Sequence, residues 1–149
     1  MSFHVRDVCP QDRSCYIEMS RQFYQGDATL HPVPVEHFER TFTLALSNSP
    51  YLRLLFIEHE QTTAGYALLA FTYSNEAGGM VVWLEELFIL PSFRNLSLGA
   101  HFLQWLKQTY QEKAKRYRLE LCSQNTGARR LYMRHAFAPL PYEQMTFDL

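Results

Sequence analysis

The spacing of hydrophobic residues changes repeatedly along the chain, and this alternation predicts a mixed α/β domain. Apolar residues three and four positions apart predict amphipathic helices, at residues 10–25, 35–47, 97–113 and 128–135. Alternating or continuous apolar runs predict β-strands, at residues 3–8, 52–58, 63–73, 80–90, 118–122 and 145–149. No repeat or linker interrupts this order, so we expect a single domain over residues 1–149.

The order of these elements also predicts how the sheet is connected. Short turns near residues 60 and 77 join three strands as an antiparallel meander. The helix at 97–113 lies between the strands at 80–90 and 118–122, and such a crossover makes those two strands parallel neighbours. We therefore expect a mixed, mostly antiparallel sheet with helices on both faces.

Composition and charge exclude several classes of protein. The 149 residues are 47% hydrophobic, and their formal net charge is only -1. A chain without basic excess is not expected to bind a nucleic-acid backbone. No apolar run approaches the roughly 20 residues of a membrane helix, and the first residues do not resemble a signal peptide. The cysteines, Cys9, Cys15 and Cys122, form no C-x-x-C pair, which favours a cytoplasmic protein without disulfides.

The segment between residues 83 and 100 carries the clearest chemical signal. A short loop here joins a strand to the start of a helix, whose free backbone N–H groups favour an anion. Small residues at Ser97, Gly99 and Ala100 allow close approach to the backbone, and Arg94 adds a charged donor. Neither a Walker A motif nor G-x-G-x-x-G is present. The alternative is an ordinary strand–loop–helix joint with Ser97 as N-cap.

Two stretches of sequence resemble the GCN5-related N-acetyltransferase (GNAT) family. Arg94-Asn-Leu-Ser-Leu-Gly99 resembles the family signature Arg/Gln-x-x-Gly-x-Gly/Ala, and the preceding Leu84–Ile89 resembles its fourth strand. Downstream, Asn125–Phe137 resembles the family's Asn-x-x-Ala-x-x-Leu-Tyr-x-x-x-Gly-Phe segment. The chain departs from these patterns at Asn95, Ser97 and Ala136, where glycine is common in the family.

The resemblance implies a GNAT (acyl-CoA N-acyltransferase) fold whose sheet splays between the fourth and fifth strands. Acetyl-CoA would lie in that opening as co-substrate, with no metal. The implied contacts are the backbone of the fourth strand, the pyrophosphate loop, and two residues of the later segment. They are Leu87, Phe88, Ile89, Arg94, Asn95, Leu96, Ser97, Leu98, Gly99, Ala100, Asn125 and Tyr132.

Direct attack of an amine on the thioester, as the resemblance implies, needs a base and an acid. Glu85 and Glu86 are the candidate bases, acting directly or through water. A flat strand sends neighbouring side chains to opposite faces, but a bulge, common in the family's fourth strand, would change this. By resemblance Tyr132 would protonate the leaving thiolate. The alternatives are solvated glutamates and an ordinary helix-face tyrosine.

Acidic and aromatic residues predict the acceptor. The family usually builds its acceptor wall between the first two helices, here from Tyr24, Asp27 and Glu36. With Glu85 and Glu86 these residues would suit a small cationic amine, and residues 83–88 resemble the corresponding stretch of diamine and polyamine acetyltransferases. The alternatives are a protein or peptide N-acetyltransferase, and a non-catalytic acyl-CoA-binding module. Family members often dimerise, and aromatic residues near the end are a candidate interface: Phe137, Tyr142 and Phe147.

Overall fold

A computed structural model describes residues 2–149 and contains a five-stranded sheet in the order β1-β2-β3-β4-β5. Neighbouring strands are antiparallel except β4 and β5, which are parallel. The strands are β1 (Phe3–Asp7), β2 (Leu52–His59), β3 (Thr62–Ser74), β4 (Gly79–Ile89) and β5 (Ala114–Leu119). The helices are α1 (Arg13–Gln25), α2 (Val35–Leu46), α3 (Leu98–Tyr110) and α4 (Thr126–Arg134), with short 3₁₀ turns at Pro10–Asp12 and Pro91–Phe93. The predicted mixed sheet and its parallel pair are confirmed.

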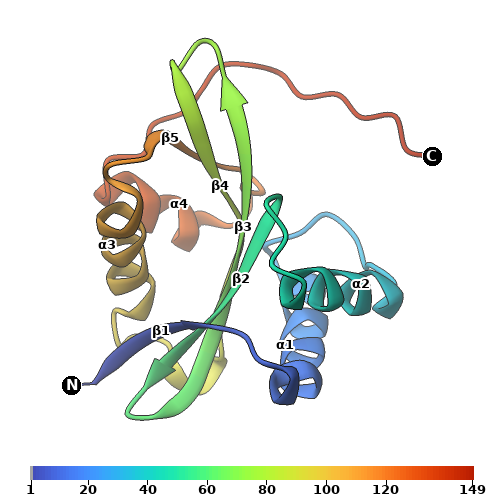
Figure 1. Ribbon diagram of the computed structural model, residues 1–149. Coiled ribbons are helices and arrows are strands. Elements are labelled where there is room, and N and C mark those ends of the chain that lie inside the picture. Colours follow the sequence, from blue (N-terminus) through green and yellow to red (C-terminus); the bar gives the residue numbers. More distant parts are fainter. Residues whose placement is uncertain (1) are drawn as a thin grey trace.

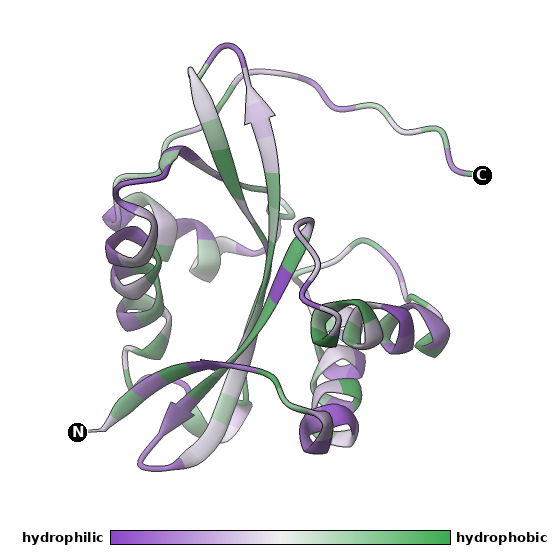
Figure 2. Ribbon diagram, in the orientation of Figure 1, coloured by the Kyte–Doolittle hydropathy of each residue, from purple (hydrophilic) through white to green (hydrophobic). Residues whose placement is uncertain are grey.

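Helices cover both faces of the sheet, as Figure 1 shows, with α1 and α2 on one side and α3 and α4 on the other. Each face has its own hydrophobic core, and the apolar residues in Figure 2 lie mainly along the sheet and the helix sides that face it. Between the sheet and α3 pack Leu55, Ile57, Val82, Leu84, Phe102 and Leu103. The core between the sheet and helices α1 and α2 contains Tyr16, Met19, Phe38, Phe42, Phe56 and Tyr66.

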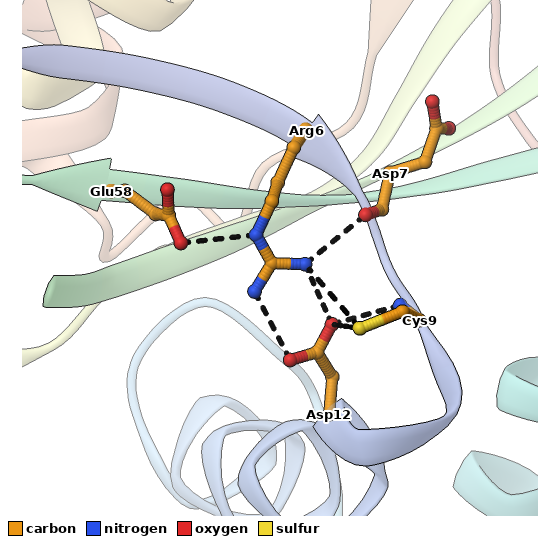
Figure 3. A network of polar contacts seen from close by, with 5 residues as sticks. All are labelled: Arg6, Asp7, Cys9, Asp12 and Glu58. Atoms are coloured by element: carbon orange, nitrogen blue, oxygen red, sulfur yellow. Dashed lines mark hydrogen bonds and ion pairs between the residues drawn. The ribbon is translucent and has the colours of Figure 1, made fainter. Parts of the chain in front are cut away.

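An ion-pair network joins the edge strand β1 to the start of α1 (Figure 3). The guanidinium of Arg6 donates to both carboxylate oxygens of Asp12, at 2.7 and 3.1 Å, and to Glu58 of β2 at 3.0 Å. Asp12 also accepts from the backbone N–H of Cys9 at 2.8 Å, which closes the turn before α1. The network therefore fixes the angle at which α1 leaves the sheet.

A β-bulge in β4 reverses which side chains face each core. The register pairs Leu68 with Glu86 and Leu69 with Leu84, so Glu85 is the extra residue. Val82 and Leu84 face α3, whereas Phe88, four residues but only three pairs after Leu84, lies in the core under α1 and α2. An extra residue shifts the period-two alternation by one position, and this explains the reversal.

The same end of β4 separates from β5. Pairing between them runs from Met80–Ala114 to Leu84–Leu119, whereas β4 stays paired with β3 as far as Ile89. Within residues 2–149, the β5-facing edge of β4 is therefore unpaired beyond Leu84. The sheet is splayed between β4 and β5, as expected.

Two predicted elements differ in the structure. The expected strand at 118–122 begins earlier and ends earlier, at Ala114–Leu119, because α3 stops at Tyr110 and the chain leaves the sheet at the splay. The expected strand at 145–149 was wrong for this structure: residues 138–149 are extended and exposed, without regular secondary structure. A strand needs a neighbour to accept its backbone hydrogen bonds, and none lies beside this segment in the described chain.

Candidate active site

A cleft of about 820 Å³ opens where β4 and β5 separate. Its walls are the end of β4, the loop before α3, the first turn of α3, one side of α4 and the end of α1. Of the residues predicted to contact acetyl-CoA, those lining the cleft are Leu87, Phe88, Ile89, Arg94, Asn95, Ser97, Leu98, Gly99, Ala100, Asn125 and Tyr132. Leu96 is exposed and is not part of this lining. The structure thus brings two sequence motifs, far apart in the chain, to one cavity.

The loop before α3 has the backbone that glycine usually provides. Asn95 and Ser97 have φ values of 65° and 61°, in the left-handed region. These are positions where the resembling family commonly has glycine. Asparagine tolerates this conformation better than most residues, and serine is small. Ser97 occupies the N-cap position, but in the described chain its side chain does not cap the helix. The first N–H groups of α3 therefore remain available to an anion.

Arg94 holds this loop against the end of β4. Its Nε donates to the carbonyl oxygen of Ile89 at 2.9 Å, and its guanidinium lies 5.7 Å from the ring centre of Phe88. The remaining guanidinium N–H groups are exposed to the mouth of the cleft, since Arg94 itself is exposed. Arg94 thus clamps the loop and keeps guanidinium N–H groups at the cleft, where such groups are able to donate to an anion.

Asn125 and Tyr132 reach the cleft through α4. Asn125 is the N-cap of α4, and its Oδ1 accepts from the N–H of Ala128 at 3.3 Å. Tyr132 lies two turns later and packs edge-on against Phe137, with ring centres 5.7 Å apart. Burial raises the pKa of Tyr132 to about 12. The hydroxyl is therefore protonated at neutral pH and can donate a hydrogen bond into the cleft.

Glu86 is the most enclosed acid near the cleft. One of its carboxylate oxygens accepts from the hydroxyl of Tyr24 at 2.5 Å, and the other from Tyr66 at 2.7 Å. Burial raises the pKa of Glu86, although the two hydrogen bonds act in the opposite direction. Burial also raises the pKa values of Tyr24 and Tyr66. Tyr24, predicted from the sequence to contact the substrate, donates to Glu86 and is not among the residues that line the cleft.

Glu85 occupies the bulge and is exposed. Neither Glu85 nor Glu86 lines the cleft, whose first β4 residue is Leu87, two positions after Glu85. Partial burial raises the pKa of Glu85, and the negative charges of Glu120 and Glu86 raise it further. The sequence did not indicate Glu120 as a site residue, because the predicted strand at 118–122 contains it. The structure places it directly after the end of β5, at the splay.

The predicted acceptor residues are only partly brought together. Asp27 lines the cleft with Gly26 and Ala28, directly after α1. Glu36 lies in the first turn of α2, is exposed, and is not among the lining residues. Sequence reasoning also left out part of the lining, namely Gln22, Phe23, Phe93, Gly127, Leu131 and Arg134.

The fold and the cleft together define a class of protein. The cleft lies at the split edge of a sheet, next to the uncapped N–H groups at the start of α3, and Tyr132 also lines it. Such a cleft suits a long ligand with an anionic end. The model of the Acetyltransferase (GNAT) family matches residues 14–137. The chain therefore belongs to the GNAT family of N-acetyltransferases.

Solved structures agree with this assignment at the level of the fold. A possible acetyltransferase from Clostridium difficile 630 has a TM-score of 0.84 at 9% identity, covering 100% of this chain and 99% of that chain. AAC(6')-Iy, in complex with the bisubstrate analog CoA-S-monomethyl-acetylneamine, has a TM-score of 0.80 at 15% sequence identity, and the match covers 100% of this chain and 99% of that chain. Glucosamine-6-phosphate N-acetyltransferase from Arabidopsis thaliana has a TM-score of 0.70 at 18% sequence identity, and the match covers 99% of each chain. No curated protein sequence gives a significant match.

Residues 2–149 contain neither a helix suited to a membrane nor a cluster of metal ligands. None of the helices there is long and apolar enough to cross a membrane. No group of three or more His, Cys, Asp or Glu side chains in that range could hold a metal ion.

Proposed function

We propose that this protein transfers the acetyl group of acetyl-CoA to a primary amine of a small cationic metabolite. The observation that carries the proposal is the cleft at the splay, which combines the phosphate loop of α3, the open edge of β4 and Tyr132. Bound acetyl-CoA supplies an acetyl group activated as a thioester. Family membership supports this donor, and so does the fit of the loop, whose Asn95 and Ser97 have the backbone needed for close approach to phosphate.

In this proposal, residues along the cleft have separate tasks in holding the donor. Arg94 and the first N–H groups of α3 bind the pyrophosphate. The backbone of Leu87, Phe88 and Ile89 offers hydrogen-bonding groups to the pantetheine arm on the edge that β5 leaves open. A backbone N–H near Ile89 polarises the thioester carbonyl.

The acceptor amine must lose a proton before it attacks. A primary amine with a pKa of about 10.4 is neutral in only about one molecule in 10³ at pH 7. Glu85 is the more accessible base, because both oxygens of Glu86 accept hydrogen bonds from tyrosines. The raised pKa of Glu85 brings it nearer to neutral pH, where a general base is most effective. In this proposal Glu86 holds Tyr24 in place and adds negative charge beside the acceptor.

Tyr132 stabilises the leaving sulfur. Tyr132 lines the cleft, and its hydroxyl is protonated at neutral pH, since burial raises its pKa to about 12. A phenol of that pKa is a weaker acid than an ordinary thiol, whose pKa is about 8.5. Tyr132 therefore stabilises the thiolate by donating a hydrogen bond more than by complete proton transfer.

Charge supports a cationic acceptor. Asp27 lines the cleft, and Glu85, Glu86 and Glu120 are close enough at the splay for Glu86 and Glu120 to raise the pKa of Glu85. Such a cluster attracts cations and disfavours anionic substrates. The complex named for AAC(6')-Iy contains an acetylated neamine, which is compatible with a small amine in this class of cleft.

A panel of acceptors tests the proposal. Diamines, polyamines, amino acids and peptides are incubated with acetyl-CoA, and acetylated products are identified by mass spectrometry. We expect a small diamine or polyamine to be acetylated, and Tyr132→Phe to lower kcat while leaving acetyl-CoA affinity nearly unchanged. Acetylation of peptides alone would favour the protein N-acetyltransferase. Binding of acetyl-CoA without transfer to any acceptor would favour a non-catalytic module.

Two further properties belong to the proposal. A cytoplasmic location is supported by the free thiols of Cys9, Cys15 and Cys122. Assembly as a homodimer is supported by the exposed aromatic side chains of Tyr142 and Phe147.

A further inference from the structure

The cleft at the splay is lined from both faces of the sheet. On one face the lining comes from the loop before α3, the first turn of α3 and one side of α4. On the other it comes from the end of α1 and the turn that follows, at residues 22–28. Figure 1 shows α1 and α3 on opposite sides of the sheet. The cleft therefore reaches through the splay and is bounded at the α1 face by the end of α1.

Two buried aromatic side chains provide the large apolar surfaces of this α1 wall. Phe23 of α1 and Phe88 of β4 line the cleft, although only 7% and 6% of their surfaces are exposed. Their ring centres are 6.3 Å apart and their planes are inclined by 89°, an edge-to-face contact at the usual distance. The wall also contains the polar side chains of Gln22 and Asp27. An apolar group that reaches the α1 wall is therefore expected to rest on the two rings.

The ring of Phe23 is held in place from behind. Its centre lies 5.1 Å from the ring centre of Tyr24 and 6.3 Å from that of Tyr66, both in edge-on contacts. Tyr24 and Tyr66 are fixed in turn, because each donates to a carboxylate oxygen of Glu86. Protein interiors of this kind are close-packed and yield little to added volume. Phe23 therefore forms a rigid stop at this end of the cleft.

We propose that Phe23 restricts the acyl group of the donor to acetyl. The inference rests on the proposed function, in which the pyrophosphate lies at the start of α3 and the pantetheine arm lies along residues 87–89. The acyl group then points toward the α1 wall. The methyl group of acetyl would rest on the ring of Phe23, whereas the longer chain of butyryl would have to displace that ring. One methylene in an apolar pocket changes discrimination by about 10- to 200-fold.

Removal of the ring should convert the stop into an apolar recess. The surroundings of a truncated core residue relax only in part, so some of the vacated space persists. The recess would be bounded by the rings of Phe88 and Tyr66, which both contact Phe23. Apolar recesses accept apolar ligand atoms more readily than water. Phe23→Ala should therefore accept butyryl-CoA, and Phe23→Leu, which removes less volume, should accept propionyl-CoA.

Equilibrium binding tests the inference without any acceptor amine. Dissociation constants of CoA, acetyl-CoA and butyryl-CoA are measured by calorimetry for the full chain and for Phe23→Ala. We expect the full chain to bind butyryl-CoA more weakly than acetyl-CoA by about tenfold or more, and Phe23→Ala to lose most of that difference. The affinity for CoA, which has no acyl group, should be the same in both proteins.

Phe42→Ala is the matched control. Phe42 belongs to the same core and is 1% exposed, but it is not among the residues that line the cleft. Its truncation loosens the core to a similar degree without opening the cleft, so the preference for acetyl-CoA should remain. Circular dichroism establishes that each variant is folded. If Phe23→Ala does not fold, the affinities for acetyl-CoA and propionyl-CoA are compared in Phe23→Leu.

The possible outcomes separate this inference from the proposed function. Equal affinities of the full chain for acetyl-CoA and butyryl-CoA would overturn the role of Phe23 and leave the proposed function standing. The same holds if Phe42→Ala loses the preference as completely as Phe23→Ala does. A full chain that binds none of the three compounds would overturn the proposed function and this inference together. If acetylation is observed, kcat/KM for the two donors should show the same preference as binding.

Discussion

The carboxylate of Glu86 is held by two phenols, and removing one of them should change how tightly it binds a proton. Tyr24→Phe deletes the hydroxyl that donates to Glu86 at 2.5 Å and leaves the ring stacked on Phe38, whose centre is 5.6 Å away. Hydrogen bonds to the charged form favour that form. Without this donor, Glu86 should therefore bind its proton more tightly, and its pKa should rise further above the ordinary value.

The size of the effect follows from the strength of the bond. A hydrogen bond to a charged acceptor contributes about 1.5–3 kcal/mol, and about 1.4 kcal/mol corresponds to a tenfold change in an equilibrium. We expect the proton affinity of Glu86 to rise by about tenfold to a hundredfold. Tyr66→Phe should act in the same direction, since Tyr66 donates to the other oxygen.

The assay is a carbon NMR titration of glutamate carboxyl groups in the free protein, with Glu86 assigned by Glu86→Gln. Tyr73→Phe is the matched control, because Tyr73 is 76% exposed. An unchanged or lower titration midpoint in Tyr24→Phe would refute the reasoning. The pH profile of kcat/KM gives a second result. The midpoint of its acidic limb should change little in Tyr24→Phe if Glu85 is the base, and should rise with the pKa of Glu86 if Glu86 is the base.

Three other predictions concern the framework of the site, and each is measured by chemical denaturation. Ser97 has a left-handed backbone, so Ser97→Val should cost about 1–2 kcal/mol while Ser97→Gly should be tolerated; equal losses would contradict this. A Cβ at Gly65 would lie 2.1 Å from a backbone carbonyl oxygen, but at Gly26 no closer than 3.7 Å; Gly65→Ala should therefore destabilise the fold severely and Gly26→Ala little. Arg6→Met should cost about 1–2 kcal/mol above pH 5, with the difference shrinking as Asp12 protonates on acidification; a difference that grows on acidification would be inconsistent.

The sign of the last prediction follows from the pKa of Asp12. Burial alone would raise that pKa, but hydrogen bonds from Arg6 and Cys9 outweigh it, so the net direction is downward. A carboxyl whose pKa is lower in the folded state stabilises the fold above its unfolded pKa of about 3.9. This contribution is lost as the pH falls through the folded value.

Local sequence signals predicted the parts of the site that depend on short-range geometry. The parallel pairing of β4 and β5 followed from the helix between them. The loop at Arg94–Ala100 was predicted to lead into a helix because apolar residues recur three and four positions apart from residue 97 onward. The bulge was expected from the family resemblance, and the structure shows it at Glu85.

Features that depend on long-range packing could not be read in the same way. The contact of Glu86 with Tyr24 joins residues 62 positions apart, and no periodicity reports such a pair. Glu120 was predicted to lie within the strand at 118–122. It lies at the splay because β5 ends one residue earlier, at Leu119. The period-two pattern at 145–149 predicted a strand, and this prediction was wrong, because a strand needs a neighbour for its backbone hydrogen bonds and residues 2–149 provide none beside this segment.

The central claim is that the cleft between β4 and β5 binds acetyl-CoA, and hydrogen exchange with and without saturating acetyl-CoA tests it most directly. The account predicts slower exchange at Leu87, Phe88 and Ile89 and in the first turn of α3, with β1 and β2 unchanged. Binding that leaves these amides unprotected, or that protects another part of the molecule instead, would contradict it.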